Sequence, residues 1–197
     1  MENKISTIIS SVAGIIQLLA FWIYNQNSIK GKTSPNIVSW GLWAGITCLN
    51  FTSYQSMSND WVKSILPTAS SFACIFTFAV LFFGKNKKIK LGIFDGIALI
   101  IGVVSVGIWF FSQSAMYANV VLQLAVLVGF IPTVRGVLKN PKNENPIPWL
   151  MWSVAYTLSS LVVFIRWHGQ LNDLVYPIVV GVIMHTTITL LSLKKKK

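Results

Sequence analysis

Trp40-Gly41-Leu42-Trp43 and Trp149-Leu150-Met151-Trp152 are two copies of one short pattern, placed 109 positions apart. Residue types that are rarely repeated by chance match at the same offset or one residue later. These matches pair Phe21 with Phe130, Lys30 with Lys139, Asn36 with Asn145 and Pro67 with Pro177. The pattern predicts an internal duplication, which makes the fold a repeat architecture.

The composition is that of a membrane protein. Of the 197 residues, 54% are hydrophobic and only 11% are charged, whereas a soluble domain carries about a quarter charged residues. Long uncharged stretches lie between Ile5 and Ile29, between Lys32 and Asp60, and between Asp95 and Arg135. Each exceeds the roughly 20 residues that cross a bilayer as a helix. Because unpaired backbone is costly in lipid, we expect an all-α protein.

The apolar stretches predict seven transmembrane helices in a 3+1+3 arrangement. The expected spans are Ile5–Tyr24, Ile37–Ser53, Ser64–Phe83, Leu91–Phe111, Ala115–Leu138, Ile147–Ile165 and Leu174–Leu193. A three-helix repeat (1–84), a linker helix (85–114) and a second three-helix repeat with a basic tail (115–197) follow from them. Three crossings would invert the second copy, and the linker helix restores its direction. The two repeats are therefore expected to be parallel, an arrangement used by transporters.

The net charge of +11 is distributed unevenly along these spans. With the N-terminus outside, 13 of the 16 basic residues fall on the cytoplasmic side: Lys30, Lys32, Lys85, Lys87, Lys88, Lys90, Arg135, Lys139, Lys142 and Lys194 to Lys197. Lys4, Lys63 and Arg166 fall outside. This positive-inside asymmetry predicts a cytoplasmic C-terminus in a multi-pass membrane protein. It favours membrane lipids as the partner of the basic tail and argues against nucleic acid.

Two stretches resemble the SWEET/PQ-loop transporter superfamily. Residues 131–141 (IPTVRGVLKNP), followed by Pro148-Trp149, look like the proline-containing helix end, basic loop and next helix of a PQ-loop repeat. Residues 32–40 (KTSPNIVSW) look like the same loop in the first copy. Thr133 stands where the family dipeptide has Gln. The resemblance implies a seven-helix transporter of bacterial type that moves a small polar solute by alternating access. It makes a sugar the leading substrate class, followed by an amino acid or a vitamin-like molecule.

The two tryptophan pairs each begin a polar face on a predicted helix. Helical spacing aligns Trp40, Trp43, Thr47 and Asn50 in the first copy, and Trp149, Trp152, Tyr156 and Ser159 in the second. Because polar groups are costly in hydrocarbon, both faces are expected to point inward and to bind a solute. The alternative places Trp40 and Trp149 in an interfacial aromatic belt and assigns the other residues to helix packing.

Three further features lie within the predicted spans. Gln17 and Gln123 need a partner in lipid, either a neighbouring helix or a ligand. His185, beside the small residue Gly181, is expected to bind solute or a proton, or to be a neutral imidazole bonded to another helix.

Three prolines and Asp95 are the remaining residues of the predicted spans to which a role is assigned. Pro132 removes a backbone donor near the end of its helix and is a predicted hinge, whereas Pro67 and Pro177 are interpreted as structural. Asp95 is expected to reach the membrane surface or to pair with Lys88 or Lys90.

The sequence favours a transporter over an enzyme. It contains no convincing nucleophile–base arrangement, no phosphate-binding glycine loop and no metal-ligand spacing, so we expect no cofactor and no metal. Cys48 and Cys74 are interpreted as small apolar residues. Transport is expected to be facilitated or proton-coupled. The alternative is a receptor or sorting protein that binds a peptide or lipid without moving it. The oligomeric state stays open.

Overall fold

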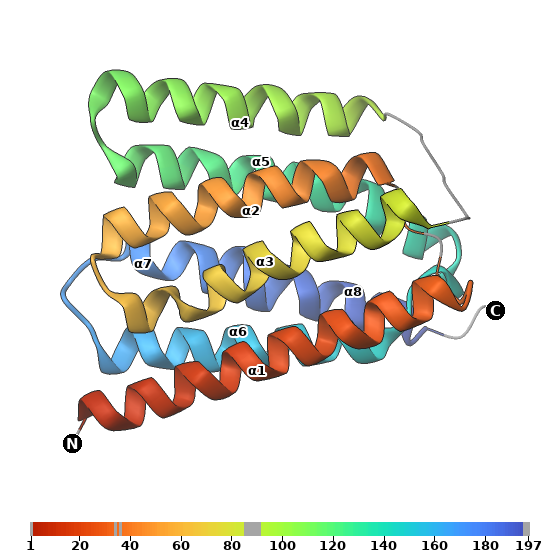
Figure 1. Ribbon diagram of the computed structural model, residues 1–197, viewed down its shortest axis with the longest axis horizontal. Coiled ribbons are helices and arrows are strands. Elements are labelled where there is room, and N and C mark those ends of the chain that lie inside the picture. The colour runs from red at the N-terminus through yellow and green to blue at the C-terminus, as the bar shows by residue number, and fades with distance from the viewer. Residues whose placement is uncertain (1, 34, 36, 85–91, 195–197) are drawn as a thin grey trace.

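The computed structural model describes residues 2–33, 35, 37–84 and 92–194, and it is all-helical (Figure 1). Lys85, Lys87, Lys88, Lys90 and Lys195 to Lys197, on which part of the charge argument rests, lie outside the described residues. The long helices are α1 (Glu2–Ile29), α2 (Ile37–Ser58), α3 (Trp61–Phe83), α4 (Ile93–Ser112), α5 (Ala115–Lys139) and α6 (Pro146–Ile165). A short 3₁₀ turn, η1 (Pro141–Asn143), precedes α6. The last span consists of α7 (Asn172–Leu174), a π-helical segment η2 (Val175–Ile183) and α8 (Met184–Ser192).

Six of these helices are long and apolar enough to cross a membrane, so the chain is an integral multi-pass membrane protein. The six are α1, α3, α4, α5, α6 and the continuous span Asn172–Ser192. The remaining predicted span, α2, is long enough to cross a membrane, but its composition is too polar for it to count among these six helices. Several of its polar residues face the interior, where Asn50, Ser53 and Tyr54 are buried, whereas Thr52 and Ser56 are exposed. The predicted starts of α2 and α5 coincide with the observed ones, and α1 extends five residues beyond the predicted Tyr24.

Helix ends are set by local sequence signals. Asp60 begins α3, because its carboxylate accepts hydrogen bonds from the backbone N–H groups of Val62 and Lys63. Asn145 caps α6 in the same way, and Pro146 occupies the first helical position, where a missing N–H costs nothing. These caps fix where each buried face starts.

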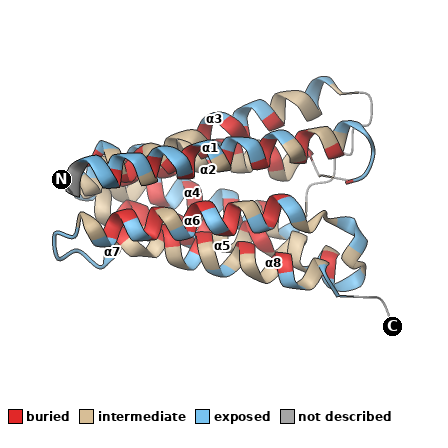
Figure 2. Ribbon diagram, turned by 90° about the horizontal axis from the view of Figure 1, so that it is seen from below, coloured by how far each residue is buried: buried red, intermediate tan, exposed pale blue. Residues whose placement is uncertain are grey.

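The helices pack as two groups of three. In the first group α3 lies between α1 and α2, and in the second the α7–α8 span lies between α5 and α6. The groups meet through two pairs, α1 against α6 and α2 against α5 (Figure 1). Figure 2 shows buried residues concentrated between the groups. The α4 helix packs on α5 and, more lightly, on α2, and most of its large apolar residues are exposed, as expected for a helix facing lipid.

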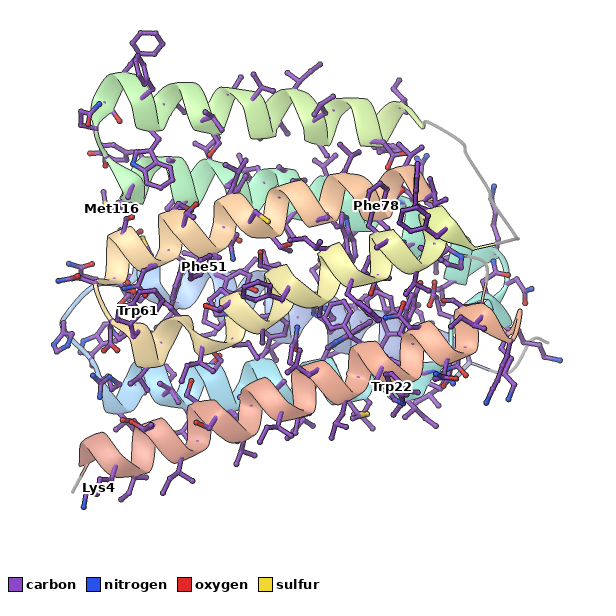
Figure 3. All side chains as sticks on the ribbon, viewed as in Figure 1. Lys4, Trp22, Phe51, Trp61, Phe78 and Met116 are labelled. Carbon is purple, nitrogen blue, oxygen red and sulfur yellow. The ribbon has the colours of Figure 1, made fainter. Side chains whose placement is uncertain are left out.

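Two ends of the bundle differ in charge. We call the end that holds Asp60, Lys63, Arg166 and Asp173 the ion-pair end, and the end that holds Lys30, Lys139, Lys142 and Lys194 the basic end. Figure 1 places the N-terminus at the ion-pair end and the C-terminus at the basic end. Figure 3 shows Lys4, Trp61 and Met116 toward the ion-pair end and Trp22 and Phe78 toward the basic end.

Pro67 and Pro177 differ in local structure although they match in sequence. Pro67 lies within a regular α-helix, whereas Pro177 lies in the wider π-helical segment of the last span. Pi-helical turns are uncommon and are frequently found at functional sites. The two groups of helices are therefore not identical in the region that faces the bundle centre.

Candidate functional site

A cavity lies at the centre of the bundle, between the two groups of helices. Its volume is about 40 Å³, room for roughly three water molecules. All three helices of each group contribute to it, through residues such as Gln17, Trp43, Ser70, Phe130, Trp152 and His185. A cavity that needs both groups to exist will change shape whenever they move relative to each other.

The first tryptophan face points into this cavity as predicted. Trp40, Trp43, Thr47 and Asn50 all line it. Gly129 on α5 makes room for the Trp43 indole, since a Cβ at that position would lie 2.6 Å from Trp43 Nε1. The membrane-belt interpretation is wrong for Trp40 and Trp149, because the exposed fractions of these two residues are only 5% and 1%.

The second face contributes in part. Trp152 and Tyr156 line the cavity, whereas Ser159 is buried but lies outside the lining. The Trp149 ring packs edge-on to Trp152, with centroids 4.9 Å apart. Phe21 packs on Trp152 at 4.9 Å, and Tyr24 on Trp40 at 5.1 Å. These rings form a continuous layer, which we call the aromatic layer.

Four polar atoms of the lining have no hydrogen-bond partner among the described residues. They are the donors Trp43 Nε1, Trp152 Nε1 and Asn50 Nδ2, and the acceptor Gln17 Oε1. Buried polar groups are normally paired, because an unpaired one costs about 1–3 kcal/mol. The described lining includes no Asp, Glu, Lys or Arg side chain. These atoms can therefore satisfy an uncharged ligand that offers several acceptors and at least one donor.

His185 lies within the wall of aromatic rings. Its Nδ1 is 2.7 Å from the carbonyl oxygen of Gly181, so Nδ1 carries a proton and Nε2 of the neutral ring is an acceptor. The Tyr156 ring stacks on the imidazole at 5.0 Å. Gly181 leaves no free space beside His185, contrary to the sequence interpretation, because the Tyr156 ring occupies it.

Gln17 and Gln123, the two amides for which the sequence predicts a helix or ligand partner, have separate roles. Gln17 lines the cavity, and its Nε2 donates to Ser70 Oγ at 2.8 Å. Gln123 lies outside the lining, and its Nε2 donates to Asn50 Oδ1 at 2.7 Å. Asn119 Nδ2 also donates to Asn50 Oδ1, at 3.1 Å. Gln123 and Asn119 therefore hold Asn50 in place across the contact between α2 and α5.

A larger opening, which we call the vestibule, lies at the basic end. Its volume is about 340 Å³, and Pro132 and Thr133 are part of its wall. Trp40 and Trp43 line both the vestibule and the central cavity, so the aromatic layer separates the two spaces. The Trp149 indole Nε1 donates to Glu144 Oε2 at 3.1 Å, and burial raises the pKa of this carboxyl to about 7.

At the opposite end, ionic contacts join the two groups of helices. Lys63 Nζ lies 2.6 Å from Asp173 Oδ2, and these side chains are 0% and 3% exposed. Tyr54 Oη donates to the backbone carbonyl of Asp173 at 2.9 Å.

The second ion pair at this end joins Arg166 Nε and Asp60 Oδ2, also at 2.6 Å. Burial alone would raise the pKa of Asp60, but the Arg166 guanidinium and the Val62 and Lys63 N–H groups lower it below its usual value. The two ion pairs and the tyrosine bond close this end of the bundle.

Asp95 does not reach the membrane surface, which was one of its two expected placements. It is buried at the start of α4, where it accepts hydrogen bonds from Ser39 Oγ at 2.7 Å and from the Gly92 N–H at 2.8 Å. Lys88 and Lys90, its expected partners, lie outside the described residues. Among the described residues, no cluster of His, Cys, Asp and Glu has the composition of a metal site.

Comparison with protein families, with curated proteins and with solved structures gives no match to this chain. The functional argument therefore depends on the chain's own geometry. Sequence reasoning missed the Lys63–Asp173 pair and Glu144. A signal for the first was present, because Lys63 and Asp173 are separated by the same 110 positions as Pro67 and Pro177. Glu144 carried no comparable signal.

Proposed function

We propose that this protein is a membrane transporter that moves a small, uncharged polar solute by alternating access. The observation that carries the proposal is the central cavity, which contains unpaired polar atoms and is closed at each end by contacts between the two groups of helices. Such a site can release its ligand to either side when one set of contacts opens and the other stays closed. Rocking of one group against the other would exchange these states.

The helix contacts support two equivalent three-helix units with α4 as the linker. If α1 corresponds to α5 and α2 to α6, the contact of α1 with α6 and the contact of α5 with α2 are the same interaction seen twice. The matched residues Lys63 and Asp173 touch each other, as expected for positions near a two-fold axis between the units. An axis along the membrane normal relates parallel repeats of this kind.

The charge distribution supports a cytoplasmic basic end. Lys30, Lys32, Lys139 and Lys142 are all exposed there. At the ion-pair end, Lys63 and Arg166 are neutralised by acidic partners within the protein. Exposed positive charge is therefore distributed more unevenly between the two ends than the sequence count indicates, and by the positive-inside rule this supports an N-terminus on the outer side. In this orientation the outer end is closed and the vestibule faces the cytoplasm.

The lining supports an uncharged substrate. An amino acid would bring a carboxylate and an ammonium into a cavity with no counter-charge, which is costly at low dielectric. A sugar, the leading class by resemblance, or an uncharged vitamin-like ring compound would offer acceptor oxygens to the indole and amide donors. Either would place a flat face on the surrounding aromatic rings. The cavity of about 40 Å³ must expand to admit it.

Solute counterflow in proteoliposomes tests the proposal, after a thermal-shift screen of sugars, amino acids and vitamins identifies a stabilising ligand. We expect counterflow that is lost on changing Trp43, Trp152 or Asn50 to Ala. Phe72→Ala, at a lipid-facing position of α3 that is 69% exposed, is the matched control and keeps full flux. Tight ligand binding without counterflow would instead establish the receptor alternative.

A further inference from the structure

Glu144 differs from the other carboxylates whose side chains the structure describes. Asp60 and Asp173 have cationic partners, and Asp95 accepts two hydrogen bonds at the start of a helix. Glu144 accepts one hydrogen bond, from the neutral Trp149 indole, and neither of the two ion pairs formed by described residues includes it. Its ionised form is therefore the least stabilised of the four.

The surroundings of Glu144 supply no compensating charge. Tyr24 on α1 is the titratable side chain that shares the vestibule wall with it, and the α2 wall contributes Ser39, Trp40 and Trp43. On the last span, His185 packs against the far side of Trp149. The described cations of the nearby helix ends and loops are all exposed: Lys30, Lys32, Arg135, Lys139, Lys142 and Lys194. Water in the vestibule is the accessible source and sink of protons for this carboxyl.

Trp149 connects Glu144 to the central cavity. Its ring packs against Trp152, His185 and Phe130, all of which line the cavity. The indole N–H that Glu144 accepts is therefore part of the aromatic layer that separates the cavity from the vestibule. A change in the strength of this hydrogen bond changes how firmly the layer is held.

We propose, building on the transport function proposed above, that Glu144 is a proton-binding site that couples the aromatic layer to cytoplasmic pH. As a carboxylate it anchors Trp149 and keeps the layer closed. When it takes a proton from vestibule water it becomes a weaker acceptor, and the layer opens toward the cytoplasm. Loss of the proton to the same water restores the closed layer.

Two physical facts support this assignment over His185. Burial raises the pKa of Glu144 to about 7, so both protonation states are populated near neutral pH. A hydrogen bond to an ionised acceptor is about twice as strong as one to a neutral acceptor. The imidazole of His185, in contrast, donates Nδ1–H to Gly181 and is stacked between aromatic rings that hold no acid.

Infrared titration of the purified protein tests proton binding without any need for transport. We expect a protonated-carboxyl band with a midpoint at about pH 7, absent in Glu144→Gln and retained in the control Asp95→Asn. Trp149→Phe removes the indole donor and should move the midpoint upward, which keeps the test valid should the Gln variant fold poorly. A band that persists unchanged in Glu144→Gln, or a midpoint unaffected by Trp149→Phe, overturns the assignment.

Flux measurements then test coupling. Glu144→Gln mimics the protonated form, so its flux should be independent of pH and, on the alkaline side of the midpoint, about fivefold above wild type. Flux in this variant that keeps the wild-type pH dependence refutes the coupling but leaves the transporter intact. A normal infrared titration with no flux in any variant refutes the transport function and, with it, the coupling.

Discussion

Lys63→Met removes one partner of the ion pair between Lys63 and Asp173 at the ion-pair end. The pair is 2.6 Å long, and its side chains are 0% and 3% exposed. Asp173 Oδ1 has no other hydrogen-bond partner among the described residues. The variant would therefore leave a buried carboxylate without a counter-charge, a change that costs about 3–5 kcal/mol. For a chain of this length, the thermal midpoint should fall by about 10 °C.

The double variant Lys63→Met/Asp173→Leu removes both charges and fills the space with apolar groups. Replacing a whole buried ion pair in this way is neutral or stabilising. Most of the lost stability should therefore return, which corresponds to a coupling energy of about 3 kcal/mol. The Tyr54 bond should persist in all variants, since it goes to the backbone carbonyl of Asp173.

Thermal unfolding in detergent measures the stability effect, with Lys4→Met as the control for an exposed lysine in α1. Accessibility measures the conformational effect. A cysteine introduced by Ser64→Cys, in a background without Cys48 and Cys74, lies at a position that is 0% exposed in this closed state. Lys63→Met should open the ion-pair end and speed the labelling of this cysteine by an impermeant thiol reagent.

Additive effects of the two substitutions would refute the reasoning, because charges that interact in a buried pair cannot contribute independently. A loss of less than about 0.5 kcal/mol in Lys63→Met would do so as well, since that is the size of an ordinary surface substitution.

Three further predictions address the cavity and the vestibule. Trp152→Phe keeps a ring but removes one unpaired donor, and it should weaken solute binding in a calorimetric titration by about 1–2 kcal/mol. Gly181→Ala places a methyl group against the Tyr156 ring and should lower the free energy of unfolding, measured by thermal unfolding, by about 1–3 kcal/mol. Gly96→Ala, where nothing lies within 4 Å of the added methyl group, should leave it unchanged. Because the pKa of Glu144 is raised from its ordinary value of 4.5 to about 7, the folded state binds more protons than the unfolded state between these two pH values. Stability should therefore fall by about 3 kcal/mol as pH rises through that window, and Glu144→Gln should abolish the slope.

The helices and the inward tryptophan face could be predicted because they follow from local patterns. Uncharged runs of sufficient length identify spans in lipid, and helical spacing places Trp43 and Asn50 on one face whatever lies opposite. The belt interpretation of Trp149 was wrong because position near a helix end does not reveal which side of the helix is covered. Ser159 and Gln123 lie on the same helical faces as the lining residues Tyr156 and Val126, but they are outside the cavity because they lie further along their helices toward the ion-pair end.

The sequence alone identifies this chain as an all-helical membrane protein with a repeated tryptophan pattern. Irregular backbone is too costly in hydrocarbon, apolar runs of about 20 residues cross it as helices, and helical periodicity is a local property. Tertiary packing decided which matched positions meet. It brought Lys63 to Asp173 and Trp149 to Glu144, and it left the indole and amide groups of the cavity unpaired. The Lys63–Asp173 contact joins residues 110 positions apart, and the energy of each contact depends on burial, which exists only after the two groups of helices have come together.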